Sequence, residues 1–429
     1  MNSIQSALLV LFLPTSLASA SQHDPEPVRI GLNHPRTGIA VAEGLDQWRA
    51  AQLAVDEINA EGGVLGRPLE LVARDSRAQV LTTQENVSEL IDEEGCKMIL
   101  GGTSSAVAVA AGEVCRARSV PFFAALAYAD SVTGAEGNRY SFRECYDTWA
   151  SSKALAAYLN EHFAGKQFFY LTADQTWGHT TESTLRKFTA TGDVSKHRGM
   201  LMDFPSASED EFKRAISFAK LVNPDVLVLV LFGKDMEAAL RQAAAQGLRS
   251  KVQVVVPNLT LGMAESAGPE VMQGVLGAVP WCWQVPATFG HWRGRRFVES
   301  FLAAYDRYPS SAAASAYAIV RQWKEAVERA GSFAGPDVVR ALEGHHYVAL
   351  KDGQTWRAWD HQSVQSVYVV RCKPAEEVRA SRLGLDFFEV VSRLDGSLAF
   401  RTKSEWEAAR AALGKPPRLG ELGDAVANK

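Results

Sequence analysis

Short apolar runs alternate with longer amphipathic stretches from residue 28 onward. Val28 to Asn33 has the two-residue alternation of a strand, and Gly44 to Ala60 carries apolar side chains at steps of three and four residues, as a helix requires. We predict further strands at 69–73, 98–100 and 120–124, and further helices at 81–91 and 105–118. Strands that alternate with helices of this length indicate βαβ units and a parallel sheet covered on both faces.

The same pattern restarts near Trp149. Strands are predicted at 168–171, 201–204, 226–231 and 252–256, and helices at 149–163, 180–189, 209–221 and 235–246. The unbroken apolar run from Val226 to Leu231 is typical of a central parallel strand buried on both faces. Later helices are predicted at 297–305, 312–330 and 336–342, and strands at 367–371 and 387–391. Ser404 with Glu407 predicts a capping box ahead of a short C-terminal helix. The whole pattern predicts an α/β fold with two doubly wound parallel sheets.

Composition and charge exclude several classes of protein. The 429 residues suffice for two domains, and 47% apolar with 22% charged residues is ordinary for a globular chain. The formal net charge of −4 gives no basic excess for nucleic acid. The five cysteines show no metal-ligand spacing. Cys96 precedes a strand and Cys115 ends the following helix, so we expect a disulfide between them, with two buried thiols as the alternative.

The N-terminus has the pattern of an export signal. An apolar run from Ala7 to Leu13 precedes the small residues Ala18-Ser19-Ala20, so we predict a signal peptide at residues 1–20 and a periplasmic location. A buried N-terminal helix is the alternative. No later stretch reaches the roughly 18 apolar residues of a membrane-spanning helix.

One segment carries a family resemblance. Asp56 to Leu71 reads DEINAEGGVLGRPLEL: a helix end, a double-glycine stop, a tight turn and a strand. This run strongly resembles the type I periplasmic binding proteins, in the branch of leucine/isoleucine/valine-binding and amide- or urea-binding proteins. Further similarities are Gly101 to Ser105, Ser119 to Phe123, Trp177-Gly178 and Arg357 to Gln362. The likeness covers roughly residues 28–375.

The resemblance implies two lobes joined by three hinge crossovers, near Cys145, Trp281 and Trp359. We expect lobe 1 at 26–145 plus 283–358, lobe 2 at 146–281 plus 359–400, and a C-terminal helix and tail at 401–429. It also implies a monomeric substrate-binding component of an ABC importer, with a membrane permease as partner and a small organic solute as ligand: a carboxylate, an amide or an amino-acid-like molecule. A ligand-sensing protein that signals to a receptor is the alternative.

Candidate ligand contacts in the first lobe follow its strands. Ser105 opens a helix, where free N–H groups suit a carboxylate, and the matching family serine binds one; a plain N-cap serine is the alternative. Leu126 and Tyr128 follow the fourth strand, at the carboxyl end of the sheet, where such sheets bind ligands; a tyrosine on a surface loop is the alternative for Tyr128. Glu43, near another ligand position of the family, is expected to be a solvated surface carboxylate; a counter-ion for a ligand's ammonium group is the alternative.

In the second lobe, Trp177 matches an aromatic ligand contact of the family; packing between the lobes is the alternative. Trp281, with Trp283, flanks the second crossover and either faces the cleft or packs in the core. Asn258 stands near the position where the branched-chain amino-acid binders carry a glutamate that neutralises the ligand's ammonium group. An uncharged asparagine there argues against an α-amino-acid ligand. Lys234 is expected to be solvated.

Enzymatic signatures are missing from the sequence. No GxSxG, P-loop or HExxH motif occurs, and His345, His346 and His361 are scattered. We therefore expect a binding protein without catalytic residues, cofactor or metal; a periplasmic enzyme is the least favoured alternative.

Overall fold

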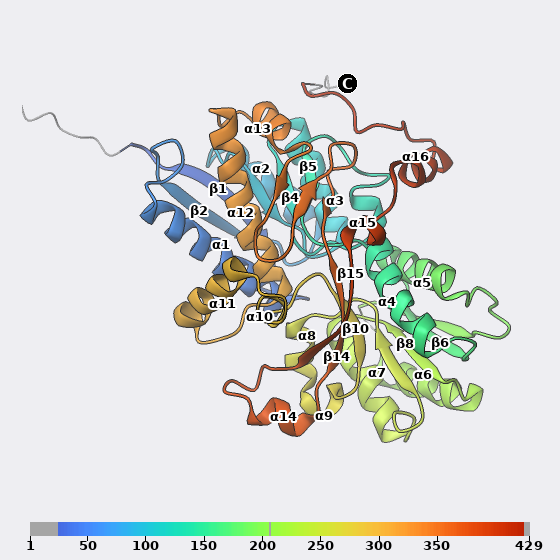
Figure 1. Ribbon diagram of the computed structural model, residues 1–429. Helices are drawn as coiled ribbons and strands as arrows, with labels where there is room; N and C mark the ends of the chain where they lie inside the picture. Colours follow the sequence, from blue (N-terminus) through green and yellow to red (C-terminus); the bar gives the residue numbers. More distant parts are fainter. Residues whose placement is uncertain (1–24, 206, 424–429) are drawn as a thin grey trace, which may run out of the picture.

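The computed structural model describes residues 25–205 and 207–423, which form two lobes (Figure 1). The sheet of the first lobe has the order β2-β1-β3-β4-β5, and all its pairs are parallel. Its strands are β1 (Val28–His34), β2 (Leu69–Asp75), β3 (Ile99–Gly101), β4 (Phe122–Ala124) and β5 (Ser141–Arg143). Its helices are α1 (Val41–Ala60), α2 (Val80–Asp92), α3 (Ser105–Ala117), the single turn η1 (Asp130–Val132), α10 (Val285–Thr288), α11 (Trp292–Tyr305), α12 (Ser311–Ala330) and α13 (Gly335–Leu342).

Small side chains bring two helices of this lobe together. α1 buries Ala50, Ala51 and Ala54, and α12 begins with the buried Ala312 to Ala314. Alanine lets helix axes approach closely, and α1 packs along α12. These two helices connect the N-terminal part of the lobe to the part that returns after residue 283.

The sheet of the second lobe has the order β15-β14-β10-β9-β8-β6-β7. Its strands are β6 (Phe168–Ala173), β7 (Gly199–Met202), β8 (Val226–Val230), β9 (Gln253–Val256), β10 (Leu276–Val279), β14 (Val367–Cys372) and β15 (Phe388–Leu394). Its helices are α4 (Thr148–His162), α5 (Thr176–Thr189), α6 (Glu209–Val222), α7 (Gly233–Ala245), α8 (Leu261–Ala267), α9 (Pro269–Met272), α14 (Ala375–Ala380) and α15 (Gly396–Ala399). The run at β8 is fully buried, as predicted, whereas β14 and β15 pair antiparallel, so this sheet is mixed.

A small antiparallel sheet of β11 (His346–Tyr347), β12 (Gln354–Trp356) and β13 (Ser363–Val364) lies beside the first lobe. Arg143, at the end of β5, forms a bridge with Gln362. Gln362 thus pairs with the first lobe, and β13 after it belongs to the small sheet, so we propose that the third crossover lies between Val364 and Val367 and not at Trp359.

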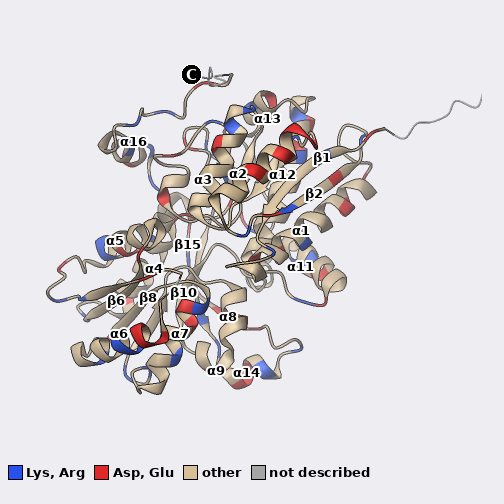
Figure 2. Ribbon diagram, turned by 180° about the vertical axis from the view of Figure 1, so that it is seen from behind, with Lys and Arg blue, Asp and Glu red and all other residues tan. Residues whose placement is uncertain are grey.

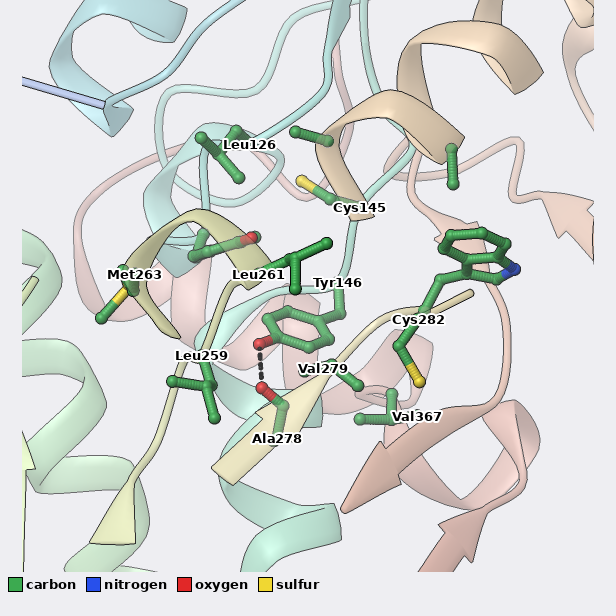
Figure 3. Packing of buried hydrophobic residues seen from close by; sticks show 14 of the residues in the cluster. Leu126, Cys145, Tyr146, Leu259, Leu261, Met263, Ala278, Val279, Cys282 and Val367 are labelled. Atoms are coloured by element: carbon green, nitrogen blue, oxygen red, sulfur yellow. Dashed lines mark hydrogen bonds between the residues drawn. The ribbon is translucent and has the colours of Figure 1, made fainter. Parts of the chain in front are cut away.

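The first two crossovers lie next to each other in space. The hydroxyl of Tyr146, just after the first crossover, donates to the Ala278 carbonyl in β10 at 2.8 Å (Figure 3). Because β10 leads directly into the second crossover, this bond ties the two hinge segments together.

Charged residues of both signs are interspersed over the helices of both lobes (Figure 2). Together with the net charge of −4, this mixture of signs among the described residues gives no excess of basic side chains of the kind that nucleic acid requires.

The structure corrects two details of the sequence interpretation. α16 (Lys403–Ala412) is capped by Thr402 with Glu405, not by Ser404 with Glu407, because two S/T-x-x-E patterns overlap there and the earlier one starts the helix. The expected disulfide is also wrong: Cys96 and Cys115 are free thiols in one apolar cluster. Their surroundings suit neutral thiols, since burial raises the pKa of Cys96 to about 12.

The predicted signal peptide lies outside the described residues, as does the end of the tail at 424–429. Within the part of the chain that the structure describes, no helix combines the length and the apolar character needed to cross a membrane.

Candidate ligand-binding cleft

A cleft of about 930 Å³ lies between loops of the two lobes. The first lobe contributes Ser105, Leu126 and Tyr128, and the second contributes Trp177 and Phe232. Four of the six predicted contact residues therefore meet at one cavity. Its size is in the range of small-molecule sites, and no lysine or arginine is among the described residues that line it.

Ser105 is held against the loop that follows β4. The N-cap of α3 is its neighbour Ser104, whose side chain accepts a hydrogen bond from the Val107 nitrogen. The Ser105 hydroxyl oxygen accepts from the Ala129 nitrogen at 3.0 Å. Its hydroxyl hydrogen can still donate, beside the free N–H groups of the first turn of α3.

Leu126 and Tyr128 form the first-lobe wall of the cleft. Both side chains are almost fully buried, and the Tyr128 ring packs on Tyr146 with centroids 4.9 Å apart. The Tyr128 carbonyl accepts from the Thr148 nitrogen at 2.8 Å, at the start of α4. Burial raises the pKa of Tyr128 well above its usual value, so this wall stays uncharged.

Arg143 fixes this wall from behind, a role that the sequence analysis missed. Its guanidinium is fully buried and donates to Gln362 Oε1 at 2.6 Å, the Ala129 carbonyl at 2.6 Å and Thr133 Oγ1 at 2.7 Å. It also lies 3.3 Å from the carboxylate of Asp147, the N-cap of α4. One side chain thus joins the loop after β4, the first crossover and the segment before β14.

Trp177 forms the facing wall from the first turn of α5. Its ring meets Phe232 edge-on, with centroids 6.4 Å apart. The following residue, Gly178, lies so close to the end of β6 that a Cβ would be 2.0 Å from the Ala173 carbonyl oxygen. Glycine is therefore needed there to seat the helix start, and with it Trp177, against the sheet.

Asn258 lies behind Trp177 and not in the cleft lining. It is fully buried, accepts the indole N–H of Trp177 at 3.1 Å and donates to Ser151 Oγ at 3.2 Å. Both the oxygen and the nitrogen of its amide are therefore hydrogen-bonded, and through the first of these bonds Asn258 holds the Trp177 ring in place.

Trp281 also lies away from the cleft. It is buried, and its ring packs near Phe297 with centroids 5.9 Å apart. Its neighbour Trp283 stacks on Tyr308 at 3.9 Å. Core packing, one of the two alternatives for this pair, is what the structure shows.

Glu43 is not the surface carboxylate that the sequence suggested. It is 3% exposed and accepts a 2.5 Å hydrogen bond from Thr260 Oγ1, the N-cap of α8 in the other lobe. Burial raises the pKa of Glu43. Beside it, Arg307 joins Asp46 at 3.1 Å to Glu265 of α8 at 3.2 Å, so α1 and α8 are linked twice across the lobes. Lys234 is exposed, as expected.

Nothing in the described residues resembles a metal centre, since no group of three or more His, Cys, Asp or Glu side chains lies close enough to bind an ion. His361 is buried, stacks on Phe142 at 4.0 Å and pairs with Glu343 Oε1 at 3.0 Å, which is a structural arrangement.

Comparison with known proteins gives the family. The sequence profile described as periplasmic binding protein matches residues 27–377. The Leu/Ile/Val-binding protein homolog 8 of Brucella abortus (strain 2308) is 25% identical over 346 residues, covering 76% of this chain and 82% of the relative.

Solved structures agree in fold. A periplasmic binding protein from Burkholderia mallei matches with a TM-score of 0.79 at 24% identity, covering 91% of this chain and 99% of the other. A solute-binding protein of an ABC transporter from R. palustris, in complex with benzoate, matches with a TM-score of 0.72 at 20% identity, covering 86% and 96%. The chain therefore belongs to the periplasmic binding protein family, whose members bind solutes without catalysing a reaction, and the predicted type I fold is confirmed.

Proposed function

We propose that this chain is the periplasmic substrate-binding component of an ABC importer, and that its ligand is a small carboxylate or amide with an apolar or aromatic body. The ligand docks on Ser105, Leu126 and Tyr128, and the second lobe closes over it with Trp177. A membrane permease then recognises the closed form. Export through a signal peptide at residues 1–20 is part of this proposal.

The proposed class of ligand rests mainly on one observation: the Asn258 side chain is uncharged, and its amide already makes two hydrogen bonds within the protein. A buried ammonium group without a counter-ion costs several kcal/mol, and this neutral amide is already bonded to Trp177 and Ser151. Two carboxylates do line the cleft, but each already has a cation nearby. Glu113 pairs with Arg116 at 2.7 Å, and Glu136 lies 3.7 Å from Lys415.

The remaining walls favour a carboxylate or amide on a flat apolar body. The first turn of α3 offers N–H groups and a partial positive charge to an acceptor at one end. Trp177 and Phe232 offer aromatic faces to the rest of the ligand. The benzoate complex of the R. palustris protein supports this class, whereas the name of the Brucella relative refers to amino acids.

Thermal unfolding of the full chain with a ligand panel tests this proposal. Benzoate, phenylacetate, benzamide, leucine and valine would each be titrated, because a ligand at 100 times its Kd stabilises the folded state by about 2.7 kcal/mol. We expect stabilisation by at least one acid or amide. Stabilisation by leucine or valine alone would refute the Asn258 argument.

A pair of tryptophan variants locates the binding. Trp177→Ala should abolish the stabilisation, whereas Trp292→Ala, at a tryptophan that is 61% exposed on α11, should retain it. Loss of uptake of the same compound in a strain lacking the gene, with restoration by the wild-type chain, tests the importer role.

A further inference from the structure

The chain after β15 connects the lobes once more. α15 packs against α4 of the second lobe. Its first residue, Gly396, lies against the third crossover, where a Cβ would be 2.7 Å from the Gln365 nitrogen. α16 then lies against the first lobe, next to the loop after η1 (Figure 1). We call residues 395–423 the C-terminal strap; the family profile ends before it, at residue 377.

Buried polar groups attach the strap to the first lobe. The Trp406 side chain is 2% exposed, and its indole N–H donates to the Thr133 carbonyl at 2.8 Å. Arg410 is 4% exposed and donates to the Gly134 carbonyl of the first lobe, and also to the Pro416 carbonyl within the strap at 2.6 Å. A buried guanidinium needs hydrogen-bond acceptors, and the carbonyls that accept from it would be left without a donor if Arg410 were removed. These contacts therefore define one docked position of the strap.

A single carboxylate joins the strap to both lobes. Asp130 Oδ2 accepts from Arg401 at 2.6 Å, while its Oδ1 accepts from Thr148 Oγ1 at 2.6 Å and from the Trp149 nitrogen at 3.1 Å. Arg401 belongs to the strap, Asp130 to the first lobe and the other two residues to the first turn of α4. Arg401 also lies 4.4 Å from the centre of the Trp149 ring.

The loop that the strap holds is part of the cleft rim. Ser131 and Glu136 line the cleft, on either side of the carbonyls that Trp406 and Arg410 bind. Lys415 of the strap lies 3.7 Å from Glu136 itself. We propose that the strap is a fourth interlobe connection, which positions the cleft rim at residues 131–136 and limits how far the two lobes open.

Distance measurements between spin labels in the ligand-free full-length protein test this. Labels at Leu81→Cys and Lys234→Cys report across the cleft, because both positions are exposed and belong to different lobes. The five native cysteines are buried, so the introduced thiols react first. No ligand is needed, and the result is independent of the proposed ligand class.

The variants compare a detached strap with an intact one. Deletion of residues 402–429 and Arg410→Ala should both shift the label distances upward or broaden their distribution. Arg340→Ala is the matched control, because that arginine is 60% exposed and its ion pair with Asp337 at 3.0 Å lies within α13 of the first lobe; it should leave the distances unchanged.

If the deletion prevents folding, Arg410→Ala and Trp406→Phe decide, because phenylalanine keeps the ring beside Trp359 and removes only the indole donor. Folded variants with lowered thermal stability but wild-type label distances would overturn the proposal, since a merely structural strap behaves in that way.

Discussion

Replacement of Arg143 by methionine tests whether one buried guanidinium holds the loop after β4 and the first crossover together. Methionine fills a similar volume but offers no donor to Gln362, Ala129 or Thr133. It also leaves the Asp147 carboxylate, which is 5% exposed, without its cation.

The size of the effect follows from these contacts. Breaking a buried ion pair by removing one partner costs about 3–5 kcal/mol, and each buried acceptor left without a donor costs about 1–3 kcal/mol, although such terms do not add fully. We therefore expect R143M to lower the free energy of unfolding by about 4 kcal/mol or more, a large part of the stability of an ordinary domain.

Urea unfolding followed by tryptophan fluorescence measures this loss, and hydrogen exchange of peptides spanning residues 126–130 localises it. Arg143→Lys keeps the positive charge beside Asp147 but loses the planar guanidinium with its several donors, so it should lower the free energy of unfolding by less than R143M does. Arg118→Met is the control: its partner Asp92 is half exposed, and such surface pairs contribute at most about 1 kcal/mol. A loss under about 1 kcal/mol for R143M would refute the reasoning.

Three further predictions concern groups near the hinge and the cleft. Burial lowers the pKa of Lys351 from 10.5 to about 8, so the unfolded state binds more protons than the folded state between those pH values. The free energy of unfolding should therefore rise by about 3 kcal/mol as the pH increases through this range. Urea titrations of Lys351→Met should lack this rise, and the same pH dependence in the variant as in the wild type would contradict the prediction. A double-mutant cycle of Trp177→Phe with Asn258→Ala, measured by urea unfolding, should give a coupling energy of about 1 kcal/mol, whereas additive effects would mean that their hydrogen bond contributes nothing. Burial raises the pKa of Glu43, so the charged carboxylate opposes folding at neutral pH. Glu43→Gln keeps an acceptor for Thr260, so it should unfold at a higher temperature than the wild type at pH 7, and the difference between the two proteins should shrink towards pH 4. A lower unfolding temperature for the variant at pH 7 would count against this.

Local patterns predicted much of this protein. The apolar run at β8 and the stops after α1 lie within a few residues of the sequence that specifies them, and Ser105, Leu126, Tyr128 and Trp177 follow strand ends. The first three lie together because the carboxyl ends of β3 and β4 share one edge of the first sheet, whereas Trp177 follows β6 of the second sheet and faces them across the cleft.

Partners far apart in the sequence explain what was missed. Glu43 is separated from Thr260 by 217 positions, and Arg143 from Gln362 by 219. No periodicity near Glu43 distinguishes a buried carboxylate from a solvated one, and Arg143 ends a strand of only three residues. Trp281 and Asn258 also lie next to strand ends, but their side chains are not among those that line the cleft. The direction in which a side chain points decides this, and the spacing of residues along the sequence does not reveal that direction.

The order of strands in the second sheet has a consequence for biogenesis. β14 and β15 complete that sheet from the far end of the polypeptide, while α11 to α13 return to the first lobe from its middle. Neither half is one continuous stretch, so a ribosome must release almost the entire chain before either core can close. A single cut between β8 and β9 would therefore leave each fragment with only part of the second sheet, and would separate α11 to α13 from the strands of the first.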